Sequence, residues 1–139
     1  MESIWSEETQ IPERKSLHDN IKVQTAVIGA GMAGILIAYF LKKEGMDVVV
    51  VEAKRIASGQ TGNTTAKITS QHGMNYDRMI KKTGEERARG YAMANEDAIK
   101  LYERIIREEK IDCDFKKLPS YLYSVDQART EELKREAEA

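Results

Sequence analysis

The sequence has few residues of the kinds that build metal centres and disulfides. It contains one cysteine, Cys113, which excludes an internal disulfide and any zinc or iron–sulfur site that needs several cysteines of this chain. The two histidines, His18 and His72, lie far apart in the sequence, which disfavours a metal centre. A chain so poor in cysteine is typical of a reducing compartment, so we expect a cytoplasmic protein.

The sequence also lacks an excess of charge and a long apolar run. Its 22 Lys and Arg residues nearly balance its 23 Asp and Glu residues, so we expect neither nucleic acid nor an acidic membrane surface as a partner. The longest nearly apolar run, Ala26 to Leu41, is shorter than the roughly 20 residues of a membrane-spanning helix. The N-terminus lacks the pattern of a signal peptide. We therefore expect no membrane span.

What the apolar run does contain is the pattern of a strand, a tight turn and a buried helix. Residues 23–28 are short and β-branched, and residues 32–44 form an apolar helix that Gly45 is expected to end. Residues 47–52 include four consecutive valines, which is typical of a parallel strand buried on both faces. The three segments together predict a βαβ unit.

The remainder predicts a helical extension and a short β-hairpin. A polar loop is expected over residues 53–73, and a capping box at Thr83 and Glu86 should start a long helix. An apolar stripe with helical spacing runs along that helix, and its residues are Ala88, Tyr91, Ala92, Asn95, Ala98, Ile99, Tyr102, Ile105 and Ile106. The two runs around Pro119 and Ser120, which are residues 115–118 and 121–125, are expected to pair as strands, and another helix begins at Glu131.

The fold class predicted is therefore α/β, with the opening part of a Rossmann-like domain. Residues 1–21 are polar and irregular and are expected to be an arm that Trp5 and Ile11 dock on a neighbouring surface. Residues 22–139 are expected to be the first part of a dinucleotide-binding domain, incomplete at its C-terminus, because two valine-rich strands alone cannot bury both faces of a sheet.

The turn carries a G-x-G-x-x-G fingerprint at Gly29, Gly31 and Gly34. It lies where the mechanism requires, between a strand and a helix. Gly29 would form the turn, Gly31 would admit a pyrophosphate to the backbone, and Gly34 would let the helix approach the strand. Amide groups at the start of the helix would bind the anion. A glycine-rich turn in an α/β protein that binds no nucleotide is the alternative.

Glu52 ends the second strand close to the spacing at which an acid binds a ribose in such folds. A carboxylate there accepts hydrogen bonds from ribose hydroxyls and repels a 2′-phosphate, which favours FAD or NAD over NADP. Lys54 and Arg55 point the other way, because a cation can hold a phosphate.

Residues 27–53 and 55–73 resemble the FAD-dependent oxidoreductases of the D-amino-acid oxidase and glycine oxidase type. They are most similar to the bacterial subgroup with a C-terminal Rieske iron–sulfur domain, and a weaker similarity continues through residues 91–99 and 111–115. The chain looks like the first third of such a protein. Related oxidases often carry Gly-Gly-Arg where this chain has Ser-Gly-Gln at residues 58–60, which leaves Arg55 as the replacement for that cation.

The resemblance implies a bound FAD and matches part of the polar loop to a flavin-contacting segment. A cation such as Lys67 near the pyrimidine end of a flavin would stabilise the reduced form. The candidate cofactor-binding residues are Gly29, Ala30, Gly31, Met32, Ala33, Gly34, Glu52, Ala53, Lys54, Arg55, Thr61, Gly62, Ala66, Lys67 and Ile68.

The activity implied by the resemblance is oxidation of a C–N bond in a small amine or amino acid. Electrons would pass to a Rieske 2Fe-2S centre outside this chain, and no catalytic residue can be assigned within it. We expect the chain alone to be inactive and to bind FAD poorly, or only after assembly with other copies. The alternatives are a fragment of an NAD-dependent dehydrogenase or reductase, and an inactive chain that only self-associates.

Overall fold

The computed structural model describes residues 11–139, so the expected docking of Trp5 lies outside the described residues. The chain divides into two compact units, of which the first ends at Ala66 and the second begins at Lys67.

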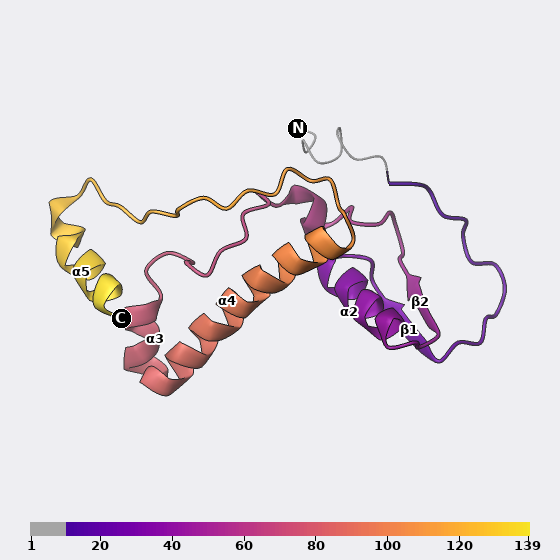
Figure 1. Cartoon of the computed structure of the whole chain (residues 1–139), viewed down its shortest axis with the longest axis horizontal. Helices are drawn as coiled ribbons and strands as arrows, with labels where there is room; N and C mark the ends of the chain where they lie inside the picture. Colours follow the sequence, from indigo (N-terminus) through magenta and orange to yellow (C-terminus); the bar gives the residue numbers. More distant parts are fainter. Residues whose placement is uncertain (1–10) are drawn as a thin grey trace. The chain divides into compact units, whose positions relative to one another are not determined.

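The first unit is built on a parallel pair of strands joined by a helix. Strand β1 (Thr25–Ile28) pairs with β2 (Val48–Val51), with Thr25 opposite Val48 and Ile28 opposite Val51. Helix α2 (Met32–Lys43) connects the strands and packs against both (Figure 1). The predicted βαβ unit is confirmed, and the α/β fold class with it.

Gly45 ends α2 as expected. Its φ of +81° is the left-handed conformation that side chains disfavour. The Gly45 N–H donates to the Lys42 carbonyl at 3.0 Å, and the Met46 N–H donates to the Leu41 carbonyl at 3.1 Å. These two bonds form a Schellman motif, which satisfies carbonyls at the end of the helix and turns the chain toward β2.

Much of the apolar surface of this unit is open within the described chain. Ile28 at the end of β1 is 90% exposed, and Ile37 of α2 is 52% exposed. Among residues 11–139, only Ala30 and Ala88 are buried apolar residues. One helix on a two-stranded sheet therefore leaves uncovered the second face that the valine-rich strands were expected to bury.

The connecting segments of the first unit carry little regular structure. The described part of the arm, residues 11–21, forms neither helix nor strand, and its role as a docking arm stays a prediction. The polar loop after β2 contains one short 3₁₀ helix, η1 (Gln60–Asn63).

The second unit is helical. Helix α3 (Tyr76–Thr83) contacts both α4 (Glu85–Glu108) and α5 (Thr130–Glu138), and a short 3₁₀ turn, η2 (Gln127–Arg129), precedes α5 (Figure 1). The Glu136 carboxylate of α5 accepts the Asn75 and Tyr76 N–H groups at 2.8 Å and the Asp77 N–H at 3.0 Å. A side chain about sixty residues away thereby caps α3, which the sequence pattern did not reveal.

The predicted capping box at Thr83 is wrong. Thr83 is the last residue of α3, and its hydroxyl donates to the Met79 carbonyl at 2.9 Å. Gly84, with a φ of +88°, separates the two helices and serves as the N-cap of α4. Because Thr83 is held in the preceding helix, it cannot adopt the extended conformation that an N-cap needs.

The predicted β-hairpin around Pro119 is also wrong. No strand forms at residues 115–118 or 121–125 in the described chain, where the only paired strands are β1 and β2. Tyr123 is 81% exposed and Val125 is 94% exposed, so these apolar side chains have no surface to pack against. An isolated two-stranded hairpin is marginal in water without such a surface.

Candidate functional site

The glycine-rich turn is set by the close approach of α2 to the end of β1. Gly29 has a φ of +99°, and its N–H donates to the Val51 carbonyl at 2.7 Å. A Cβ at Gly34 would lie only 1.9 Å from the Gly29 carbonyl oxygen and 3.4 Å from Val27 Cγ1. Glycine is therefore required at Gly34 by contact, and at Gly29 by backbone conformation.

Several backbone N–H groups at the start of α2 donate no hydrogen bond within residues 11–139. Within that range, the N–H groups of Gly31, Ala33 and Gly34 have no hydrogen-bond acceptor. The first helical bond into this turn runs from the Ile35 N–H to the Gly31 carbonyl at 3.0 Å. These donors, at the positive end of the helix dipole, suit an anion such as a pyrophosphate.

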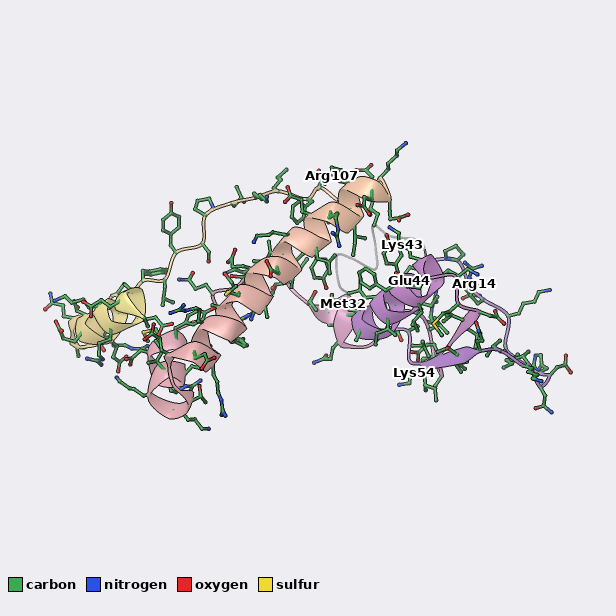
Figure 2. All side chains as sticks on the ribbon, turned by 60° about the horizontal axis from the view of Figure 1, so that its bottom comes forward. Arg14, Met32, Lys43, Glu44, Lys54 and Arg107 are labelled. Carbon is green, nitrogen blue, oxygen red and sulfur yellow. The ribbon has the colours of Figure 1, made fainter. Side chains whose placement is uncertain are left out.

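The Met32 amide is the exception, because the Thr61 hydroxyl oxygen accepts its hydrogen bond at 3.0 Å. A Cβ at Gly31 would lie 3.3 Å from the same hydroxyl oxygen. Thr61, a residue predicted from the polar loop, therefore lies directly at the glycine turn. Met32 marks this end of α2 in Figure 2.

Glu52 joins the end of β2 to the same turn. Its Oε2 accepts the Ala30 N–H and its Oε1 accepts the Lys54 N–H, both at 2.9 Å. The hydrogen bond from the Ala30 amide, and then that from Lys54, lower the pKa of Glu52 below its usual 4.5, so the group is ionised near neutral pH. Two oxygens with about four lone-pair sites have capacity left for ribose hydroxyls.

The loop after β2 is anchored on the turn through a residue that the sequence analysis missed. The Ala57 N–H donates to the Ala30 carbonyl at 3.0 Å, and the Ala57 carbonyl accepts the Gly62 N–H at 2.8 Å. A Cβ at Gly62 would lie 2.7 Å from the Ala57 oxygen, so glycine is required there too. Nothing about an alanine in a polar loop signals this role.

The two cations after Glu52 differ in their surroundings. The Arg55 guanidinium lies 3.5 Å from a carboxylate oxygen of Glu13, and both side chains are largely exposed. The Lys54 backbone, with Ala53 between it and Glu52, contributes the second amide to the carboxylate. Glu13 was not singled out in the sequence, where one acid in a polar arm carries no signal.

Three of the predicted cofactor residues lie at or beyond the junction of the two units. Ala66 is the last residue of the first unit, and its N–H donates to the Thr64 hydroxyl oxygen at 3.2 Å. Lys67 and Ile68 belong to the second unit, where the Lys67 ammonium donates to the Ser120 hydroxyl oxygen at 3.2 Å. A flavin-binding role for these three residues stays a prediction.

The family is decided by comparison with known proteins. A family model described as "FAD dependent oxidoreductase" (DAO) matches residues 24–139, which include the glycine turn and Glu52. The chain belongs to the DAO family of FAD-dependent oxidoreductases. The amides and carboxylate described above fit the cofactor that this family implies.

The relatives are much longer than this chain. The chain is 37% identical to the "Putative Rieske 2Fe-2S iron-sulfur protein YhfW" of Bacillus subtilis over 99% of its own length and 27% of that protein. It is 29% identical to gamma-glutamylputrescine oxidoreductase of Escherichia coli, over 73% of the chain and 24% of the relative. It is 35% identical to mitochondrial dimethylglycine dehydrogenase of Rattus norvegicus, over 63% of the chain and 9% of the relative. No solved structure gives a significant match.

Residues 11–139 contain neither a membrane-spanning helix nor a cluster of metal-binding side chains. None of the helices in that range combines the length and apolar character needed to cross a bilayer. The same residues hold no group of three or more His, Cys, Asp or Glu side chains arranged to bind a metal ion.

We predict opposite effects on stability for two glycine substitutions. Gly34→Ala forces a methyl group against the Gly29 carbonyl and should destabilise the protein by about 2–3 kcal/mol. Gly90→Ala, in open space within α4, should stabilise it by about 0.5–1 kcal/mol. Urea unfolding followed by circular dichroism measures both, and equal effects of the two substitutions would contradict the close approach at Gly34.

We also predict that Glu52 contributes to acid unfolding of the first unit. A carboxylate whose pKa is lowered on folding stabilises the native state above its usual pKa of 4.5, and this contribution is lost as the pH falls through the lowered value. Glu52→Gln should therefore be less stable than the wild type near pH ~7, with the difference shrinking toward pH ~2. Urea unfolding across this pH range measures it, with Glu44→Gln at the other end of α2 as the control (Figure 2).

Proposed function

We propose that this chain is the N-terminal FAD-binding portion of a longer FAD-dependent oxidoreductase. The observation that carries the proposal is the pairing of two groups at one turn. The acceptor-free amides of Gly31, Ala33 and Gly34 suit a pyrophosphate, and the ionised Glu52 beside them suits the adenosine ribose. Loop residues Thr61 and Gly62, anchored at that turn, extend the polar surface.

The reaction we propose is oxidation of a C–N bond in an amine or amino acid. Two relatives support this class, because the names gamma-glutamylputrescine oxidoreductase and dimethylglycine dehydrogenase each specify a substrate with an amine nitrogen. Bound FAD would supply the hydride acceptor for the carbon of that C–N bond. Passage of the electrons to a Rieske centre is supported by the name of the Bacillus subtilis relative. The groups that bind substrate would lie outside this chain.

The residues of this chain would bind and orient the cofactor. The helix α2 amides would neutralise the pyrophosphate charge, and Glu52 would fix the ribose by accepting from its hydroxyls. The same acid disfavours a 2′-phosphate, so the geometry suits FAD and NAD equally well up to the ribose. Family membership favours FAD.

Purification of the full-length protein tests the proposal. It should carry flavin absorbance near one FAD per chain, and Glu52→Ala should weaken FAD binding roughly 10–100-fold, because hydrogen bonds to a charged group are lost. Glu44→Ala, at the far end of α2, is the matched control and should bind like the wild type. A colourless protein that reduces or oxidises a nicotinamide would favour an NAD-dependent enzyme. Oligomers indifferent to both cofactors would favour self-association.

We further predict that Lys67 tunes the flavin. If its ammonium lies near the flavin pyrimidine ring, Lys67→Met in the full-length protein should lower the two-electron midpoint potential by roughly 20–40 mV, since a cation that stabilises the reduced form is lost. Lys82→Met on α3 is the control. Redox titration measures the potential, and an unchanged value would remove Lys67 from the flavin site.

A further inference from the structure

A cleft of about 460 Å³ lies next to Glu52 in the first unit, within the size range of small-ligand sites. One wall comes from the end of β2 and the loop that follows it, residues 49–56, with Ala30 and Ile35 beside them. The other wall comes from the N-terminal arm, residues 11–17 with Ile21. Arg14 on the arm and Lys54 on the loop locate these two segments in Figure 2.

The arm walls the cleft without being packed into a core. Its side chains Leu17 and Ile21 are 56% and 48% exposed, although both line the cleft. The ion pair between Glu13 and Arg55 joins the arm to the loop after β2. An exposed pair of this kind contributes little to stability, and further burial of the apolar arm side chains would add to it.

We infer that residues 11–21 form the outer wall of the pocket for the adenosine half of the dinucleotide. The inference rests on the proposed function. Ala30 of the glycine turn and Glu52, which accepts the Ala30 N–H, both line this cleft, so the cleft adjoins the proposed ribose site. If the ribose is held by Glu52 and the phosphates by the α2 amides, the base would lie next to Glu52, where the cleft opens. Leu17 and Ile21 give the arm side of the cleft an apolar surface of the kind that packs against the flat face of a purine.

The test compares two matched leucine substitutions in the full-length protein. Leu17→Ser removes an apolar side chain from the arm wall, and Leu118→Ser removes one that is 79% exposed and lines no part of the cleft. Calorimetric titration is done with FAD and with ADP, which carries the adenosine and pyrophosphate but no flavin. We expect Leu17→Ser to weaken both ligands roughly fivefold to tenfold and Leu118→Ser to change neither.

Limited trypsin digestion gives a second readout that does not depend on affinity. Arg14 and Lys15 lie on the arm and line the cleft, so saturating ADP should slow cleavage there at least threefold. Circular dichroism of each variant serves as the control that it is folded.

The possible outcomes distinguish failure of the inference about the arm from failure of the proposed function. If the wild type binds FAD and ADP but Leu17→Ser binds them equally well, and ADP leaves arm cleavage unchanged, the inference is overturned and the proposed function stands. If Leu17→Ser weakens FAD but not ADP, the arm contacts the flavin half, which also overturns it. If the wild type binds neither ligand, the proposed function fails and the inference with it.

Discussion

The first unit depends on one close contact, between the backbone of α2 at Gly34 and the carbonyl of Gly29. Any side chain at Gly34 would have its Cβ 1.9 Å from that oxygen, so helix and strand meet at backbone distance. This proximity brings the first amides of α2 next to the end of the sheet, where the polar loop and Glu52 also arrive. Without it, the amides and the carboxylate would not share one site.

Glu52 adds a fixed negative charge next to the glycine turn. By accepting the Ala30 and Lys54 N–H groups, it ties the end of β2 to the glycine turn. The same bonds keep it ionised by lowering its pKa. Because Glu52 accepts from the Ala30 and Lys54 amides, the N–H groups of Gly31, Ala33 and Gly34 stay available for a bound anion.

Sequence reasoning succeeded where the determinants are local and failed where they are distant. Gly34 acts through a close backbone contact and Gly45 through a left-handed conformation, and a strand–turn–helix pattern reveals both. The short helix α3 was not predicted because its cap comes from Glu136, far along the chain. Thr83 is the last residue of α3 and therefore cannot form the expected capping box. The hairpin at residues 115–125 had suitable strand formers but no surface to cover, and β-propensity without burial does not make a sheet.

The structure also bears on the conflict between Glu52 and the cations that follow it. Arg55, the residue best suited to hold a 2′-phosphate, has its guanidinium 3.5 Å from the Glu13 carboxylate, so part of its charge is already compensated. An exposed pair contributes little to stability, about 0–1 kcal/mol, so the larger obstacle to a 2′-phosphate is its repulsion by the ionised Glu52. The partly compensated charge of Arg55 and the negative charge of Glu52 both disfavour a 2′-phosphate. They favour a dinucleotide whose ribose carries free hydroxyls.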